Sequence, residues 1–109
     1  MAVQVILSAV GPLPVKATFN APGDMPMYIE VNGSIWTQTA NQMIGINIDL
    51  DGTIIGTAQI FSNGASTQRA VVPAWVPVKL TQGQHTLTLS TASATVSDSN
   101  DSFVVVLHY

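Results

Sequence analysis

The chain has 109 residues and a net charge of −3, and only 8% of its residues are Asp, Glu, Lys or Arg, against roughly 25% in an ordinary soluble domain. Its fixed cations are Lys16, Arg69 and Lys79, too few and too scattered to form a basic stripe for phosphates, which excludes nucleic acid as a partner. There is no cysteine, so disulfides and thiolate metal sites are excluded as well.

Short runs of β-branched residues with period-two alternation recur along the chain, separated by turn residues, and no long 3.6-residue apolar period occurs. We therefore predict an all-β fold, a single domain over residues 1–109, built as an antiparallel two-sheet β-sandwich resembling a jelly roll with eight or nine strands. Strands are expected at 2–8, 15–20, 25–31, 34–39, 43–50, 53–61, 70–80, 84–90 and 102–109.

The opening stretch, MAVQVILSAVGPLPV, is apolar but lacks a basic region, and Gly11, Pro12 and Pro14 interrupt it. It fits a first strand better than a signal peptide or a spanning helix. We expect no membrane insertion, and a soluble protein that is cytoplasmic or exported without a classical signal peptide.

Asn32-Gly33 is a typical two-residue turn, which predicts a hairpin between 25–31 and 34–39. Across that hairpin Tyr28 would lie beside Trp36 and Gln38 on the outward side. This cluster is the first candidate surface.

In INIDLDGTIIG, residues 46–56, the acids around Asp51 could belong to a calcium loop or to a turn. No acid follows in TIIGTAQIF to close a calcium loop, whereas Asp51-Gly52 suits a type I′ turn. In that register Ile48 faces Ile55. The opposite side would then hold a flat set of small side chains: Gly45, Asn47, Gly56 and Ala58.

The run VVPAWVPVKL contains Pro73 and Pro77, which cannot donate to a strand ladder and therefore indicate a sheet edge or a bulge. Trp75 would then be partly exposed. With Arg69 it forms a second candidate surface.

His85 and His108 are the only side chains suited to acid–base work near neutral pH, and both lie on strand faces committed to packing or assembly. No nucleophile elbow or carboxylate pair can be placed. We expect no catalytic residues and no enzyme.

The last strand is apolar on both sides, because Val104 and Val106 alternate with Phe103, Val105 and Leu107. The second apolar side must be covered by loops or by another chain. We favour another chain, and therefore a homo-oligomer.

Just before this strand, SDSNDS places oxygen ligands on Asp98, Asn100 and Asp101 in one loop. Calcium binds such mixtures of carboxylate and amide oxygens. The alternative is a turn in which these side chains satisfy local backbone donors, with no metal or other cofactor.

DSNDSFVVVLHY resembles the C-terminal loop and strand of small bacterial calcium-dependent lectins that bind fucose and mannose. More broadly, IDLDGTIIGTAQIF and GQHTLTLSTASATVSDSNDSFVVVLHY resemble jelly rolls of the tumour-necrosis-factor and complement-C1q type. The second resemblance implies assembly as a trimer or a multiple of a trimer.

The function that we predict is an oligomeric bacterial lectin, in which aromatic rings stack on sugars while neutral polar groups bind their hydroxyls. The alternative is a non-catalytic structural jelly roll, such as a phage fibre knob or a toxin-associated scaffold. The candidate carbohydrate-binding residues are Trp36, Tyr28, Gln38, Trp75 and Arg69.

Overall fold

The computed structural model describes residues 2–109, which form nine β-strands and no helix. Met1, the first residue of the predicted domain, lies outside this part of the chain. The strands are β1 (Val3–Val10), β2 (Val15–Ala21), β3 (Met25–Ile35), β4 (Gln42–Leu50), β5 (Thr53–Ser62), β6 (Arg69–Ala70), β7 (Ala74–Leu80), β8 (Gly83–Thr91) and β9 (Ser102–His108). Since no helix occurs in these residues, none is available to cross a bilayer.

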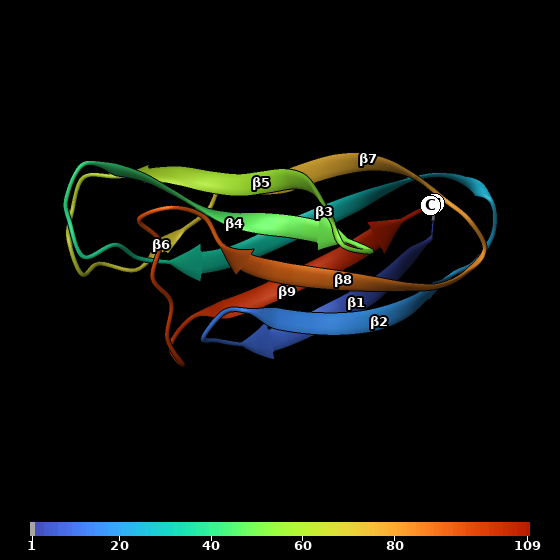
Figure 1. Cartoon of the computed structure of the whole chain (residues 1–109), viewed down its shortest axis with the longest axis horizontal. Helices are drawn as coiled ribbons and strands as arrows, with labels where there is room; N and C mark the ends of the chain where they lie inside the picture. The colour runs from blue at the N-terminus through green and yellow to red at the C-terminus, as the bar shows by residue number, and fades with distance from the viewer. Residues whose placement is uncertain (1) are drawn as a thin grey trace.

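The strands form two antiparallel sheets that pack against each other (Figure 1). The five-stranded sheet has the order β1-β9-β3-β6, with β7 also paired to β3, and the four-stranded sheet has the order β2-β8-β4-β5. The predicted antiparallel two-sheet sandwich is therefore confirmed.

Alternate residues of the central strands point between the sheets and form the core. Each such side chain stabilises the fold by roughly 1.5–3 kcal/mol through burial. The fully buried members of the central strands are Met27, Ile29, Val31, Ile35, Ile44, Ile46, Ile48, Leu87, Leu89, Phe103, Val105 and Leu107.

The turn between β4 and β5 has the predicted geometry. Asp51 and Gly52 have φ angles of 53° and 92°, the positive values that a type I′ turn requires. The hairpin interpretation of this stretch is confirmed.

Further along the same hairpin, the predicted register is wrong. Ile48 pairs with Gly56 and not with Ile55, because a bulge lies between the turn and the body of the hairpin. The extra residue turns Ala58 into the core, where it is 1% exposed, and brings Gly56 towards Val76 of the other sheet. The flat outer side of small residues is therefore not formed.

The hairpin predicted at Asn32-Gly33 is also wrong, because β3 runs through both residues without turning. Gly33 lies opposite Phe103, and a Cβ atom there would come within 2.6 Å of the Phe103 ring. The glycine permits close packing here and does not make a turn.

β7 is an edge strand, bonded only to β3, as Pro77 predicts. The predicted strand 70–80 is interrupted at 71–73, the segment that contains Pro73, so that β6 and β7 are separate. Trp75 is 51% exposed, which confirms the expectation for it.

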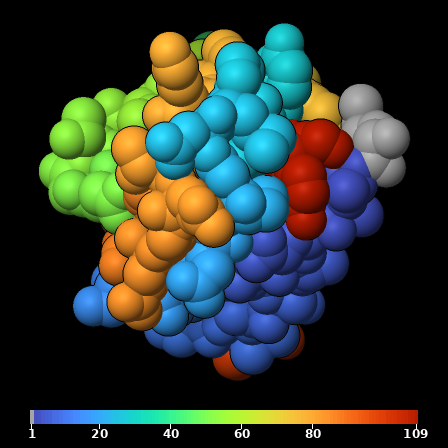
Figure 2. Space-filling model, turned by 90° about the vertical axis from the view of Figure 1, so that its right-hand side faces the viewer, coloured from blue at the N-terminus to red at the C-terminus, as the bar shows by residue number. Residues whose placement is uncertain are grey.

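The two ends of the sandwich differ. One end carries the β2–β3, β4–β5 and β7–β8 turns, coloured cyan, green and orange, beside the C-terminus (Figure 2). There the Ala2 amide donates to the Tyr109 carbonyl at 2.6 Å, and the Tyr109 amide to the Ala2 carbonyl at 3.0 Å. The β3–β4, β5–β6 and β8–β9 loops lie towards the other end (Figure 1).

Candidate functional site

The β3–β4, β5–β6 and β8–β9 loops are bonded to one another through their backbones. Trp36, directly after β3, and Val96 of the β8–β9 loop exchange two hydrogen bonds, of 2.9 and 2.8 Å. The Ser66 amide of the β5–β6 loop donates to the Thr37 carbonyl at 2.7 Å. These bonds hold side chains from distant parts of the sequence in one place.

Asp101 and Asp98 give the β8–β9 loop its shape. Asp101 is fully buried and accepts hydrogen bonds from the Ser34 hydroxyl at 2.8 Å and the Asp98 amide at 2.9 Å, one on each carboxylate oxygen. Asp98 Oδ1 accepts from the Asn100 amide at 2.8 Å. The acids predicted as calcium ligands therefore satisfy local backbone donors, as in the alternative interpretation.

Metal ligands are sparse in this loop. Both oxygens of Asp101 are occupied by donors from the fold. Within residues 2–109, no group of three or more His, Cys, Asp and Glu side chains is arranged to hold a metal ion.

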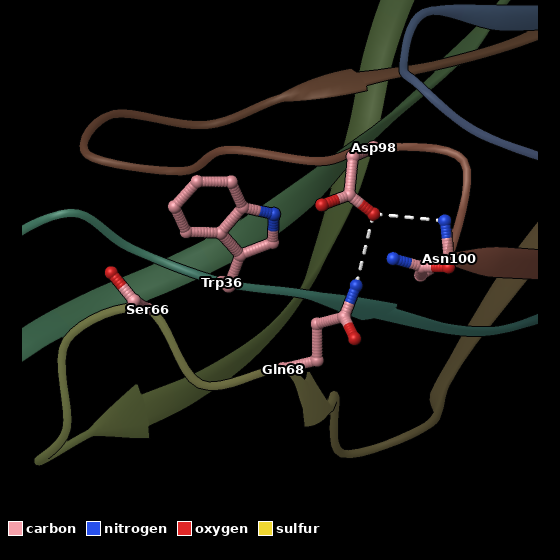
Figure 3. A pocket seen from close by; sticks show the side chains of 5 residues that line it. All are labelled: Trp36, Ser66, Gln68, Asp98 and Asn100. Carbon is pink, nitrogen blue, oxygen red and sulfur yellow. Dashed lines mark hydrogen bonds between the residues drawn. The ribbon is translucent and has the colours of Figure 1, made fainter.

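A pocket of about 280 Å³ lies where the three loops meet (Figure 3). The Gln68 side-chain amide donates to Asp98 Oδ1 at 3.0 Å and so links the β5–β6 and β8–β9 loops across it. No donor in residues 2–109 bonds to Asp98 Oδ2, which remains free to accept a hydrogen bond from a ligand. The lining residues are Trp36, Ser66, Gln68, Asp98 and Asn100.

The indole of Trp36 forms the apolar wall of this pocket. Its Nε1–H group is buried and has no acceptor among residues 2–109, and Figure 3 shows the nitrogen on the side of the ring nearer Asp98. A buried donor without a partner costs roughly 1–3 kcal/mol. An acceptor brought by a ligand or by water would remove that cost.

A second hollow, of about 270 Å³, lies beside the Trp36–Val96 bridge, with Thr37 and Val96 in its wall. Its polar groups are neutral amides and hydroxyls, including the exposed Gln38. The other lining residues are Thr39, Gln42, Ala94 and Thr95. Gln38 therefore lies near Trp36, but in an adjoining hollow.

The structure separates Tyr28 from Trp36. They are eight residues apart along the extended chain of β3, a distance of about 26 Å. Tyr28 instead lies beside Trp75, with the ring centroids 6.3 Å apart. The two aromatic residues that the predicted hairpin would join are thus at opposite ends of the sandwich.

Arg69 and Trp75 are also apart. Arg69 pairs with Ile35 in β6, whereas Trp75 pairs with Glu30 in β7. Five residues of β3 separate the two positions, or about 16 Å. Arg69 is therefore closer in the sheet to Trp36 than to Trp75.

Both histidines bond to carboxylates. His85 Nδ1 lies 2.6 Å from Asp51 Oδ2, and His108 Nε2 lies 2.8 Å from Glu30 Oε1. The two side chains are 11% and 12% exposed. These contacts agree with the structural roles expected for the two residues.

Sequence reasoning missed Ser66 and Gln68, which come from an unremarkable loop of small and polar residues. It selected Asp98 and Asn100 as calcium ligands and Trp36 as a sugar-binding ring, without placing them together. No sequence signal links the β5–β6 loop to the β8–β9 loop, because the link is a side-chain hydrogen bond between residues 30 positions apart.

No family model matches the chain, and neither does any curated protein. Several solved structures share its fold. The C-terminal domain of EclA, described as a sugar-binding protein, aligns with a TM-score of 0.53 and 14% identity, over 98% of this chain and 79% of that one. A family 35 carbohydrate-binding module from Clostridium thermocellum aligns with a TM-score of 0.50 and 10% identity, over 96% and 90% of the two chains.

A viral protein also aligns, the VP2 subviral particle protein of infectious bursal disease virus, with a TM-score of 0.48 and 16% identity over 97% of this chain and 31% of that one. At 14% and 10% identity, the likeness to the EclA domain and to the carbohydrate-binding module establishes the fold alone. The chain has a β-sandwich fold that sugar-binding proteins and carbohydrate-binding modules also have, which confirms the predicted resemblance at that level. The resemblance to the tumour-necrosis-factor and C1q type stays a prediction.

Proposed function

We propose that this domain is a lectin that binds neutral carbohydrate in the pocket beside Trp36. Its main support is the composition of that pocket: an aromatic wall, an indole N–H group without an acceptor, a carboxylate with a free oxygen, and side-chain amides. A sugar offers to these groups an apolar C–H face and a rim of hydroxyls.

Each group has a defined task in this proposal. The Trp36 ring stacks on the sugar, and Asp98 Oδ2 accepts hydrogen bonds from one or two hydroxyls, which are strong because the acceptor is charged. The side-chain amide of Asn100 can both donate and accept. The Trp36 N–H donates to a ring or hydroxyl oxygen.

The charge of the pocket favours a neutral ligand. Asp98 is the only ionisable residue among those that line it, so a phosphate or a sugar acid would meet repulsion and no compensating cation. Fold likeness to the EclA domain and to the family 35 module is consistent with this proposal.

The first test is an array of neutral and acidic glycans, followed by titration of the best-binding glycan. The chain has two tryptophans, so Trp75→Phe leaves Trp36 as the only one, and its fluorescence should change as the glycan binds. Trp36→Ala should weaken binding about tenfold, equivalent to about 1.4 kcal/mol. Asp98→Asn, which keeps an acceptor for the Asn100 backbone amide, should weaken glycan binding to a similar extent.

Trp75→Ala is the matched control, because it removes the second tryptophan, which is 51% exposed, and leaves the pocket intact. If it abolishes binding while Trp36→Ala does not, the sugar binds on the Tyr28–Trp75 surface and the pocket is not the site. Binding should persist in the presence of a chelator, because both Asp101 oxygens already accept hydrogen bonds and Asp98 Oδ2 is then the one carboxylate oxygen of the β8–β9 loop without a donor in residues 2–109. Loss of binding on chelation would favour the calcium-dependent alternative.

A structural scaffold remains the second candidate, supported by the exposed apolar side chains on the five-stranded sheet. It predicts a defined oligomer that binds no glycan on the array. In the lectin proposal, by contrast, assembly raises the effective affinity of weak single sites. The trimeric stoichiometry suggested by the jelly-roll resemblance can be checked by native mass measurement.

A further inference from the structure

The outward side of β1, β9, β3 and β7, here named the β9 face, is mainly apolar. Residues that pair directly across antiparallel strands share a face, so the register places Val5, Val106, Glu30 and Trp75 in one row. Val5 and Trp75 are 61% and 51% exposed. The row beside it contains Val3, His108, Tyr28 and Pro77, and Val104 lies on the other side.

The outer face of the four-stranded sheet is polar along its middle. Its central row consists of Ser90, Asn47 and Thr57, and the next contains Lys16, Thr88, Asp49 and the exposed Ile54. The other large exposed apolar side chains of this face, Met43 and Phe61, pair with each other at the end of the β4–β5 hairpin far from its turn. An antiparallel sandwich normally has such polar outer faces, because they are in contact with water. The β9 face departs from this pattern although it belongs to the same small domain.

The carboxylate within the β9 face is hydrogen-bonded by its neighbours. Glu30 accepts hydrogen bonds from Asn32 at 3.0 Å and from His108 at 2.8 Å. These bonds hold the pKa of Glu30 below its ordinary value, and the bond from Asn32 has the largest effect. The nearest fixed cation on this face is Lys79, which lies beyond Pro77 near the end of β7.

Aromatic rings line a hollow of about 440 Å³ at one end of the face. Trp75 stacks on His108 with centroids 4.4 Å apart, and Tyr28 packs edge-on against Trp75. Met27 and Tyr109 also line the hollow. Rigid half-exposed aromatic residues beside a hollow are the side chains that most often contribute the largest share of binding energy at protein interfaces.

We infer that the β9 face packs against the β9 face of a second copy of this chain. Four strands at about 4.8 Å and seven residues at about 3.3 Å give a flat area of about 19 by 23 Å, or about 450 Å² before side-chain relief is counted. A patch of this size falls within the range of the largest apolar patch on a typical monomer, and such a patch often marks a functional surface. It is little more than half of the roughly 800 Å² per partner of a standard interface, so the pairing should be reversible.

A second copy suits the chemistry of this face better than other partners do. Two such faces bring apolar rows together, and the Glu30 carboxylate between these rows is already hydrogen-bonded by Asn32 and His108 within each copy. An acidic peptide or an anionic lipid surface would need cations, and Lys79 is the only one near the rows described. This inference does not depend on sugar binding.

The test is the molar mass of the full chain in solution, measured by light scattering and native mass spectrometry. Dilution from ~100 µM to ~0.1 µM crosses the micromolar Kd expected for an interface at the low end of the size range. We expect dimers at the upper concentration, which dissociate on dilution. A monomer at every concentration would overturn the inference.

Val5→Lys introduces a charge into the face, and Ile54→Lys is its matched control. Ile54 is 58% exposed, close to the 61% of Val5, but belongs to the other sheet. We expect Val5→Lys to lower the assembled fraction at least tenfold at mid-range concentration, and Ile54→Lys to leave it unchanged. If both leave it unchanged, or both abolish it, the β9 face is not the interface.

Val5→Thr covers the case in which the lysine variant does not fold, because it changes polarity at nearly constant shape. Like Val5→Lys, this variant should weaken association, and its unfolding temperature should be unchanged. A monomeric Val5→Lys protein that still binds soluble glycan would support this interface and leave the proposed sugar pocket intact. If Trp36→Ala loses glycan binding but assembles as before, the sugar pocket is supported independently of the interface.

Discussion

The ion pair between His85 and Asp51 should make the stability of the domain depend on pH in a defined direction. His85 Nδ1 lies 2.6 Å from Asp51 Oδ2, and Nε2 lies 2.7 Å from the Thr81 carbonyl oxygen. Both partners are acceptors, so both ring nitrogens must donate and the imidazole must be protonated. These hydrogen bonds raise the pKa of His85 above 6.5, and the bond with Asp51 has the largest effect. Burial opposes the shift.

The pKa of Asp51 moves the other way. Burial is the largest single influence and raises it, but hydrogen bonds from His85 and the Thr86 amide, together with the charge of His85, bring it below 3.8. The contribution of His85 to stability is complete below pH 6.5 and is lost as the pH rises through its folded-state pKa. The contribution of Asp51 is complete above pH 3.8 and is lost as the pH falls through its folded-state pKa.

Asp51→Asn is the informative change, because asparagine tolerates the positive φ angle of this turn and can still accept from the Thr86 amide. A hydrogen bond to a charged group contributes roughly 1.5–3 kcal/mol. Asp51 is 46% exposed, however, and exposed pairs contribute only about 0–1 kcal/mol. We expect a loss of about 1 kcal/mol near pH 5.5, or about 4 °C in Tm, and a much smaller loss at about pH 9.

The assay is urea unfolding followed by tryptophan fluorescence at both pH values. Asp49→Asn is the control: Asp49 accepts from the Gly52 amide at 2.8 Å in the same hairpin but bonds to no histidine. Its cost should be the same at both pH values. An equal loss for Asp51→Asn at the two pH values, or none near pH 5.5, would refute the assignment of a protonated His85.

Two further substitutions test the packing of β3 and the loop that shapes the pocket. Gly33→Ala should destabilise the domain by about 1–3 kcal/mol in chemical unfolding, because the new methyl group would lie 2.6 Å from the Phe103 ring; an unchanged midpoint would contradict the close packing. Asp101→Ala leaves two donors without an acceptor, the Ser34 hydroxyl and the Asp98 backbone amide. It should lower the free energy of unfolding by about 1–3 kcal/mol for each of them. Thermal unfolding measures this loss, and Ser34→Ala, which removes one of the two donors, should cost less.

Strand positions could be predicted from the sequence because alternation reports which residues are buried. The alternation itself indicates which side of a strand is buried, without information on any partner strand. Examples are Leu87 and Leu89 in β8, and Val105 and Leu107 in β9. Asp51-Gly52 likewise specifies its own turn through local backbone preference. These features depend on residues close together in the chain.

The errors arose where a distant partner decides the local structure. Asn32-Gly33 has the preferred residues of a turn, yet Gly33 is held in a strand by its neighbour Phe103. The bulge before Gly56 cannot be read from the alternation, since a single inserted residue reverses every following side chain. The false turn at Asn32-Gly33 also led to the prediction that Tyr28 lies beside Trp36, whereas its ring packs against Trp75.

The candidate pocket was predictable only in part, for the same reason. Trp36 is identifiable as an outward aromatic residue that follows buried Ile35. Its neighbours Gln68 and Asp98 come from loops whose meeting is decided by the order of strands in the two sheets. Residue types alone indicate neutral polar chemistry but not where it converges.

The hydrogen-bonded pairing of Ala2 with Tyr109 has a practical consequence for handling this molecule. Both residues lie at one end of a body 43 Å long, and the β3–β4, β5–β6 and β8–β9 loops, which form the Trp36 pocket, lie towards the other end (Figure 1). A tag, dye or solid support attached next to either residue would point away from the pocket. Molecules anchored in this way would present the β3–β4, β5–β6 and β8–β9 loops outward in a uniform orientation, which suits a measurement of the proposed binding to a surface coated with glycans.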